Sequence, residues 1–261
     1  MTHHQRRFLS SIAVVLVAAL LAATAFFVVR ENDQAHQAAT QAAVRDKLTL
    51  LRSRLEGQLY GNILLVRGLV SVFAAKPDLD QQDFARFAHP LFSGRSQLRN
   101  LGAAPDMVIR AVYPLAGNEA ALGLDYRTHP VQRAAAERAR ESGEIILAGP
   151  LAMVQGGVGI IARFPVFLDD ENGERRFWGL LSAAIDAERL WRDSGLYDDD
   201  TIELAIRGRD GLGAAGEVFF GDPALFDVPS ERSELSLPHG SCNWPHAHAA
   251  AGRSGPRQRP I

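Results

Sequence analysis

The sequence predicts an α+β protein in which one long amino-terminal helix precedes two antiparallel sheet units, the second smaller than the first. No proline and no turn cluster interrupts residues 34–73, where alanine, leucine, glutamine and arginine dominate, so this stretch favours a single helix. Three apolar runs separated by short turns follow within residues 145–185, a pattern typical of an antiparallel sheet. A hydrophobic share of 47% and a charged share of 22% indicate a chain that packs a core.

The first element is an uncharged apolar segment, residues 8–29, which predicts a membrane-spanning helix. A helix of about 20 residues crosses the ~30 Å hydrocarbon layer. Because Arg6 and Arg7 precede this segment, we expect a single-pass protein of the bacterial inner membrane, with its N-terminus in the cytoplasm and the rest of the chain periplasmic or extracellular. A cleaved signal peptide is the alternative, because Thr24 lies between two alanines as in a small-residue cleavage site.

The next element is a stalk helix, residues 31–75, with a regular apolar seam. The seam runs from Leu48 to Phe73 at 3-4 spacing and includes one polar residue, Asn62. A buried asparagine can fix the register of a parallel helix pair, so one interpretation is a homodimer that forms through the stalk. The other is that the seam packs on the globular domain of its own chain, because Gly57 and Gly61 weaken an autonomous coiled coil.

Shorter elements follow the stalk. We expect an amphipathic helix at residues 78–92, a strand at 107–113, a helix at 131–142 that ends at Gly143, and a short helix that Asp186 opens. The other expected strands are residues 145–147, 159–167, 177–185, 201–207 and 217–220. A helix followed by a sheet, repeated once at smaller size, is typical of a PAS-like domain with a smaller companion.

The composition argues against several functions. A net charge of -2 gives no long-range basic field, so nucleic acid is not an expected partner. Cys242 is the single cysteine and cannot form an internal disulfide. The histidines show no metal-ligand spacing, the carboxylates Asp125, Asp186 and Glu188 are isolated, and no Gly-x-Ser-x-Gly motif is present. We therefore expect neither an enzyme nor a bound metal or cofactor.

The last segment, residues 241–261, differs in kind from the rest. It has no hydrophobic period, it contains basic residues but no acidic ones, and we expect it to be disordered. The codons for residues 242–245, read two bases later, give glutamine or a stop, then leucine and alanine. A shifted reading frame is therefore a second explanation of this tail.

Several short motifs resemble a known family. They comprise residues 118–126, 149–151 (Gly-Pro-Leu), 155–157 (Gln-Gly-Gly), 163–167 (Arg-Phe-Pro-Val-Phe), 177–180 (Phe-Trp-Gly-Leu) and 185–190. Together they resemble the CHASE domain, an extracytoplasmic sensor of bacterial receptor kinases and diguanylate cyclases and of plant cytokinin receptors. The resemblance extends over residues 84–237. The expected domains are 1–30, cytoplasmic N-terminus and transmembrane helix; 31–75, stalk helix; 76–240, CHASE-like sensor; and 241–261, tail.

The resemblance implies a receptor with a second transmembrane helix and an intracellular effector after the sensor. Because nothing after Leu237 is long and apolar enough to span a membrane, we expect the membrane-anchored ligand-sensing part of a signal-transduction receptor, without its effector. The alternative is an exported small-molecule-binding or adaptor protein without its own signalling output.

The expected ligand is a small diffusible molecule, acidic in class. Arg110 and Arg163 each interrupt an apolar strand, and each must either meet an anionic group or point to solvent. By the resemblance, the two polar ligand contacts of plant cytokinin receptors fall near Ala116 and at Ala148, whose methyl groups cannot hydrogen-bond a purine. The candidate ligand-binding residues are Arg110, Tyr113, Asn118, Ala148, Gln155 and Arg163.

Overall fold

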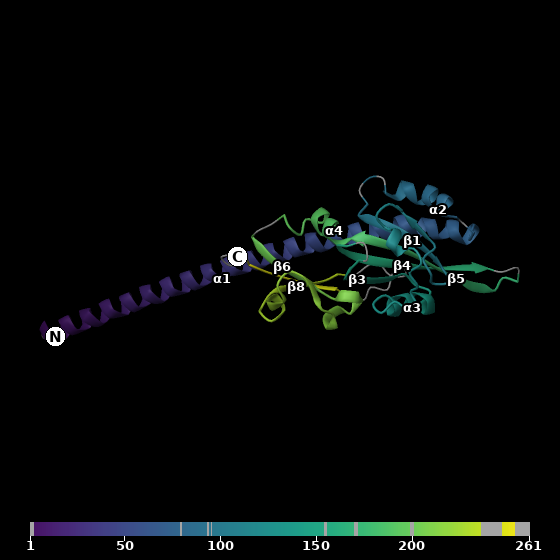
Figure 1. Ribbon diagram of the computed structural model, residues 1–261. Helices are drawn as coiled ribbons and strands as arrows, with labels where there is room; N and C mark the ends of the chain where they lie inside the picture. The colour runs from purple at the N-terminus through teal and green to yellow at the C-terminus, as the bar shows by residue number, and fades with distance from the viewer. Residues whose placement is uncertain are drawn as a thin grey trace. The chain divides into compact units, whose positions relative to one another are not determined.

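The computed structural model describes residues 3–78, 80–92, 94, 96–153, 156–169, 172–198, 201–235 and 247–253. The helices are α1 (His3–Ala75), α2 (Gln81–Ala88), α3 (Arg133–Ser142) and α4 (Ala187–Asp193). The strands are β1 (Leu98–Pro105), β2 (Ala111–Tyr113), β3 (Ile146–Ala152), β4 (Val158–Asp169), β5 (Arg175–Asp186), β6 (Ile202–Arg207), β7 (Val218–Phe220), β8 (Glu231–Leu235) and β9 (Ala247–Arg253). One long helix followed by a larger and a smaller antiparallel sheet confirms the predicted α+β architecture (Figure 1).

The chain divides into two compact units, Met1–Asp46 and Lys47–Ile261. The described part of the first unit is the beginning of α1, whose large apolar side chains from Leu20 to Val29 are 60–68% exposed. Within the described residues, α1 is the one helix with the length and apolar composition that a membrane crossing requires.

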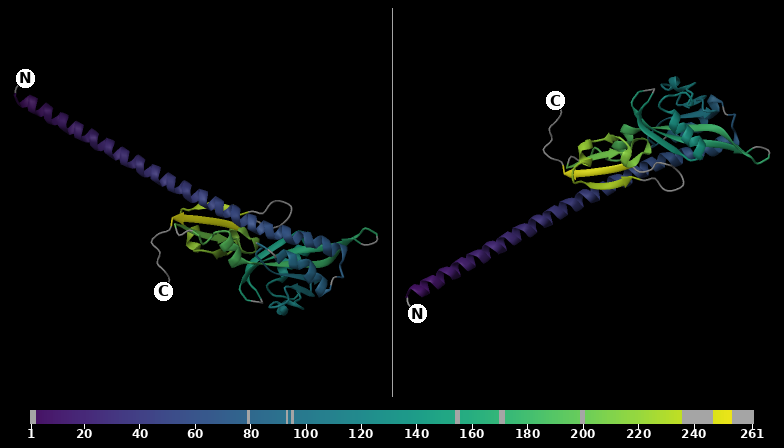
Figure 2. Two further views of the ribbon diagram at one scale, coloured as in Figure 1. Left: turned by 90° about the horizontal axis from the view of Figure 1, so that it is seen from above. Right: turned by 90° about the horizontal axis from the view of Figure 1, so that it is seen from below.

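The second half of α1 packs against the sheets of its own chain. The seam residues Leu48, Leu59 and Val66 are buried, and Phe73 contacts the Trp178 ring with centroids 5.2 Å apart. Both views of Figure 2 show this part of α1 running alongside the two sheets. The interpretation of the seam as a contact with a partner helix is therefore wrong. The seam is used within the chain because a sheet exposes an apolar face that a helix must cover.

The larger sheet has the strand order β2-β1-β5-β4-β3, and all of its pairs are antiparallel. Side chains alternate between its two faces along each strand. Leu101 and its cross-strand partner Ala183 face α1, whereas Gly102 and its partner Ser182 face the other way. Alanines of α3, Ala136 and Ala139 among them, cover this other face in one apolar cluster.

The smaller sheet has the strand order β7-β6-β9-β8. Its strand β9 lies within the segment that we expected to be disordered, and the rest of that segment is outside the described residues. The backbone of β9 pairs on both sides, with β6 and with β8, so hydrogen bonding to two neighbours compensates for the absence of a hydrophobic period.

Two further differences concern the larger sheet. The expected strand at 107–113 begins only at Ala111, because Asp106 and Met107 adopt positive φ angles of 49° and 69° in a turn. Strand β1 was not expected, because Asn100, Gly102 and Pro105 are poor strand formers. It forms nevertheless, because β2 and β5 pair with it on either side.

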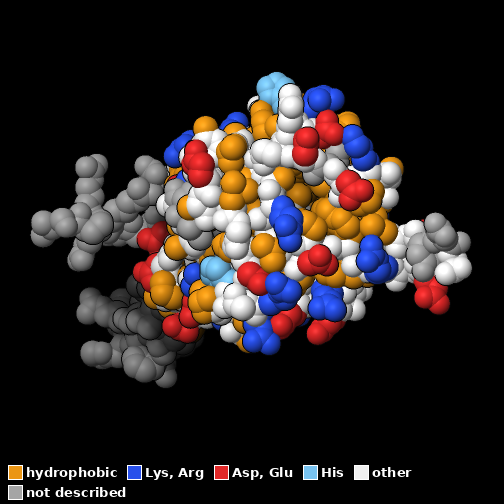
Figure 3. All heavy atoms as spheres, turned by 45° about the vertical axis from the view of Figure 1, so that its right-hand side comes forward, with side chains coloured by type: hydrophobic (Ala, Val, Ile, Leu, Met, Phe, Trp, Pro, Cys, Tyr) orange, Lys and Arg blue, Asp and Glu red, His pale blue; other side chains and the backbone are white. Residues whose placement is uncertain are grey.

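The surface carries charges of both signs. Acidic and basic side chains are interspersed over the face in Figure 3, with hydrophobic surface between them. This distribution fits the net charge of -2, and it produces no large region of one sign on that face.

Candidate functional site

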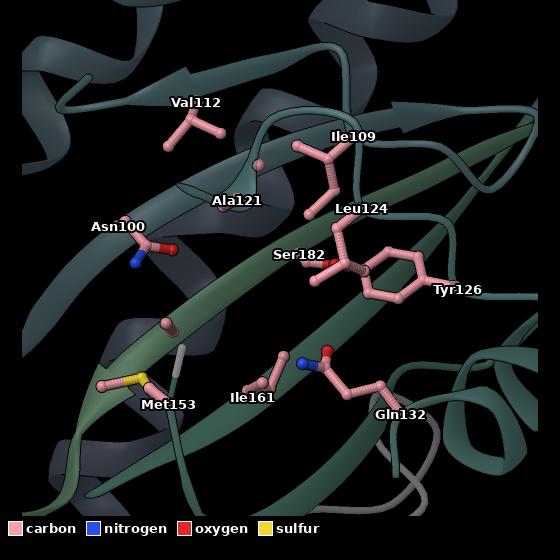
Figure 4. A pocket seen from close by; sticks show the side chains of 12 residues that line it. Asn100, Ile109, Val112, Ala121, Leu124, Tyr126, Gln132, Met153, Ile161 and Ser182 are labelled. Carbon is pink, nitrogen blue, oxygen red and sulfur yellow. The ribbon is translucent and has the colours of Figure 1, made fainter. Parts of the chain in front are cut away.

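The candidate site is a cavity of ≈ 40 Å³ on the face of the larger sheet that α3 covers. Its lining residues come from the sheet, from the turn between β1 and β2, from the segment between β2 and α3, and from the residue that follows β3. They are Asn100, Gly102, Ile109, Val112, Ala121, Leu124, Tyr126, Gln132, Met153, Ile161, Ser182 and Ala184 (Figure 4). In this view Asn100 and Met153 lie toward one end of the cavity, and Tyr126 and Gln132 lie toward the other.

Two rows of cross-strand partners form the sheet floor on the cavity side, and five of their members, Asn100, Gly102, Ile161, Ser182 and Ala184, line the cavity itself. One row crosses the sheet through Gly102, Ser182, Arg163 and Ile146, and the next crosses it through Asn100, Ala184, Ile161 and Ala148. Cross-strand partners share a face, so both rows point toward the cavity side. Several members are small, and this leaves space that the covering segment does not fill.

Two pairs of polar side chains are hydrogen-bonded at the cavity. The Tyr126 hydroxyl donates to Ser182 Oγ at 2.9 Å. Asn100 Nδ2 donates to Asn118 Oδ1 at 2.8 Å, and Asn118 Nδ2 donates to the Pro114 carbonyl at 2.9 Å. Because all four side chains are buried, these bonds hold the polar groups in fixed orientations.

Arg163 is the unusual member of the floor, because its side chain is fully buried yet mostly unpaired. Its Nη2 donates to Gln132 Oε1 at 2.9 Å, and its guanidinium carbon lies 5.3 Å from the centroid of the Tyr126 ring. Among the residues that the structure describes, Nε and Nη1 have no hydrogen-bond partner, and no carboxylate forms an ion pair with Arg163. A buried cation in this state is costly.

Burial also changes the protonation equilibria at this end of the cavity. It lowers the pKa of the Arg163 guanidinium, and it raises the pKa of the Tyr126 phenol. In both residues burial disfavours the charged form. The nearby Arg163 charge and the hydrogen bond to Ser182 only partly offset the effect on Tyr126.

None of the predicted site residues that the structure describes is among the residues that line the cavity, but three of them adjoin it. Arg163 is the cross-strand partner of Ser182, Ala148 is the cross-strand partner of Ile161, and Asn118 bonds to Asn100. Two other predicted residues lie elsewhere. Tyr113 pairs with Leu101 on the α1 face, where its hydroxyl meets His89 Nδ1 at 2.6 Å.

Arg110 lies apart from Arg163. It is exposed and borders a separate surface hollow together with Asp106 and Arg176, so the two arginines do not form one site. Gln155, the last predicted residue, is outside the described residues.

Sequence reasoning missed most of the polar lining. Tyr126 and Gln132 sit in the irregular segment before α3, where no periodicity predicts which side chains point inward. Ser182 lies inside an apolar strand, where a single buried serine gives little signal. One signal was available, because an arginine inside the apolar strand β4 requires polar partners on the same face.

The side chains at the cavity have features of a binding site. The Ser182 hydroxyl bonds to the Tyr126 hydroxyl, and the described lining residues include no histidine, lysine or carboxylate that could activate a serine nucleophile. The described residues contain no group of three histidine, cysteine or acidic side chains that could hold a metal ion. The arrangement provides hydrogen-bond donors, one cation and an apolar wall, which are features of small-molecule sites.

The family model described as CHASE domain matches residues 106–220, which include most of the cavity lining. No curated protein matches the sequence.

Solved structures of sensor domains share the fold. One is an extracellular ligand-binding receptor from Desulfohalobium retbaense DSM5692, with a TM-score of 0.58 at 17% identity over 78% of this chain, which spans 39% of that receptor chain. A second is the ligand-binding domain of the Pseudomonas aeruginosa PAO1 amino acid chemoreceptor PctC in complex with GABA, with a TM-score of 0.56 at 19% identity over 81% of this chain and 98% of that one.

A third is the corresponding domain of the chemoreceptor PctB of the same organism in complex with L-Arg, with a TM-score of 0.55 at 15% identity over 81% of this chain and 87% of that one. At these identities the likeness concerns the fold. Residues 106–220 of this chain thus match the CHASE domain model, and the chain has the α+β fold of these sensor domains.

Proposed function

We propose that this chain is the membrane-anchored sensing part of a signal-transduction receptor and that a small diffusible molecule binds in the cavity between the larger sheet and its covering segment. The observation that carries the proposal is the cavity itself, most of whose lining lies in the region that matches the CHASE domain model and which is lined by oriented polar groups. The chemoreceptor domains of the same fold bind GABA and L-Arg, and their example supports a ligand of similarly small size. The domain binds its ligand and does not convert it.

The anchor is residues 8–29, with the N-terminus in the cytoplasm and the sensor periplasmic, in the bacterial inner membrane. The exposed apolar side chains of α1 and the two arginines before them support this topology. An exported binding or adaptor protein is the second candidate, and the same cavity would serve it.

A homodimer through the stalk would use the face of α1 opposite the buried seam. Gly57, Gly61, Leu64 and Gly68 follow 3-4 spacing on that face, and all four are exposed. A Cβ added at any of the three glycines would meet nothing within 4 Å. Exposed glycines weaken a helix unless another backbone approaches them, which supports a helix partner at this face.

Ligand screening tests the sensor proposal. The full chain in detergent is screened by thermal shift against acids, amines and purines, and at least one class is expected to raise its unfolding temperature. Ala184→Leu should abolish that rise because it fills the cavity, whereas Val131→Ala, at a position 66% exposed, should not. A rise that persists in Ala184→Leu would exclude this cavity as the binding site.

Fusions and crosslinks test the topology and the dimer. A phosphatase joined after Ser230 should be active and a β-galactosidase inactive, and deletion of residues 8–29 should abolish the phosphatase activity.

In membranes, Leu64→Cys should form a disulfide-linked dimer, whereas Leu59→Cys, which is buried in its own chain, should not. Crosslinking at Leu59 alone would contradict the proposed face.

A further inference from the structure

The ligand class follows from the Arg163 guanidinium, a buried and largely unpaired group that lies beside the cavity lining. A guanidinium carries five N–H donors, and within the described residues this group makes one hydrogen bond, to Gln132. The side chain is fully buried, so bulk water does not reach it. Buried polar groups in folded proteins normally have partners, and an exception indicates a missing one.

The surroundings of Arg163 specify a negative charge for that missing partner. Within the described residues, no acidic side chain lines the cavity. Asp210 acts on Arg163 only from beyond ion-pair distance, and Arg138 opposes that effect. The Asp210 Oδ1 atom is already bonded to the Gly149 N–H at 2.7 Å. The positive charge of Arg163 is therefore available to an anion.

Arg163 adjoins the cavity through three of its lining residues. Ser182 is its cross-strand partner, Gln132 accepts its hydrogen bond, and the Tyr126 ring lies against it. A carboxylate at this end of the cavity would take charge-assisted hydrogen bonds from the free N–H groups. The Tyr126 and Ser182 hydroxyls lie beside it and can donate or accept further bonds.

The apolar wall and the volume of the cavity determine which groups the ligand can carry besides its carboxylate and how large it can be. The cavity wall is largely apolar, and in Figure 4 Ile109 and Leu124 lie on the upper side of the cavity and Ile161 on the lower side. The described lining residues include no acidic side chain that could pair with an ammonium, and burial of an unpaired ammonium is costly. The volume of ≈ 40 Å³ holds about three waters, which corresponds to an acid of about four to six non-hydrogen atoms.

We propose that Arg163, held by Gln132 against Tyr126, is the anion anchor of the sensor and that its ligand is a short monocarboxylate without an ammonium group. This inference rests on the proposed function, because it assigns the chemistry of the same cavity. It separates this chain from the two chemoreceptor domains of the same fold, which bind GABA and L-Arg.

Calorimetric titration of the full chain in detergent, in a buffer free of carboxylates, tests the inference. The probes are acetate and propionate, their amides acetamide and propionamide, and the amino acids glycine and GABA. The acids are expected to bind, and the amides and amino acids to bind at least about 10-fold more weakly, because they lack the charge or bring an unpaired one.

Substitutions of Arg163 and of control residues test whether this side chain binds the acids. Arg163→Met should abolish acid binding, and Arg163→Lys should retain part of it because it keeps the charge. Arg176→Met, an exposed arginine on the neighbouring strand β5, should bind the acids as the parent chain does. If Arg163→Met does not unfold cooperatively, Gln132→Leu replaces it. This variant should weaken acid binding because the guanidinium loses its one hydrogen bond.

The outcomes separate the two proposals. Equal binding of propionate and propionamide, or of propionate and glycine, would overturn the monocarboxylate while leaving the cavity as the binding site. Loss of acid binding in Arg110→Met with retention in Arg163→Met would move the anion site to the surface hollow and overturn the anchor. The absence of binding by any acid would also overturn the inference, and the wider screen with Ala184→Leu would still test the sensor.

Discussion

Asn62 on the α1 face of the larger sheet and Arg163 on its cavity face are both buried, but they differ in how many of their hydrogen bonds are made. On the α1 face, Asn62 is 2% exposed and its amide is fully engaged. Its Nδ2 donates to Gln97 Oε1 at 2.7 Å and to the Gln58 carbonyl at 2.8 Å, and its Oδ1 accepts from the Gln97 N–H at 3.0 Å. On the cavity face, Arg163 is equally buried but has one hydrogen bond.

The difference separates a structural group from a binding group. A polar side chain whose bonds are all made within the protein fixes how elements pack, here α1 against the beginning of β1. A buried side chain with open bonds lowers stability, and in the proposed sensor a ligand makes those bonds. Substitution of Asn62 and substitution of Arg163 should therefore change stability in opposite directions.

The largest effect is expected on the α1 face. Asn62→Ala leaves the Gln97 N–H and Oε1 without their partner and should lower the free energy of unfolding by about 2–4 kcal/mol. Urea unfolding followed by circular dichroism measures the change. Leu64→Ala, on the exposed face of the same helix, is the control and should stay within about 0.5 kcal/mol. An equal loss in both variants would mean that helix propensity, and not the hydrogen-bond network, sets the effect.

The cavity face should respond with the opposite sign. Arg163→Met removes a buried, largely unpaired cation and keeps a side chain of similar length, so the unliganded protein should become more stable by about 1–3 kcal/mol. The same urea titration measures it in the absence of carboxylates. A destabilised Arg163→Met would show that the guanidinium has partners in solution, such as ordered water, and is structural after all.

The sequence predicted the elements that have local signals, and it did not predict which elements pack together. The helix, strands β4 and β5 and the Gly143 end of α3 were predictable, because long apolar runs and a left-handed glycine are local signals. The partner of the α1 seam was not predictable, because an apolar stripe has the same sequence pattern whether a sheet of the same chain or a second helix covers it.

The candidate site was predictable only in part. Arg163 was recognisable because a cation inside an apolar strand is rare. Tyr126 and Gln132 were not, because the irregular segment that carries them reaches Arg163 only through the tertiary fold. Arg110 looked equivalent in sequence, but the turn at Asp106 and Met107 places it outside the strand and on the surface.

A smaller effect is expected where the two sheets meet. Asp210, beside the smaller sheet, accepts the Gly149 N–H of β3 at 2.7 Å and has a φ angle of 57°. Asp210→Ala loses the acceptor and places alanine in a left-handed conformation, so the free energy of unfolding should fall by about 1–2 kcal/mol. Asp210→Asn keeps an acceptor and tolerates that conformation, so it should fall by less. Equal losses in the two variants would show that the carboxylate charge matters more than its hydrogen bond.

The smallest effect concerns the pH dependence of the cavity face. Burial raises the pKa of Tyr126, whereas the unfolded chain ionises this phenol at about pH 10. Below that pH the phenol is neutral in both states and contributes no pH dependence. Above it the unfolded state releases the proton first, so unfolding becomes more favourable and stability falls as the pH rises toward the folded pKa.

Tyr126→Phe should cost about 0.5–1.5 kcal/mol near neutral pH, through the lost bond to Ser182, and should then lose less stability than the parent chain between pH 9 and 11. Unfolding midpoints measured from neutral pH to pH 11 give both the cost of the substitution and the loss of stability with rising pH. Parallel curves for the two proteins would mean that Tyr126 reaches solvent, and the cavity would then be more open than its buried lining indicates.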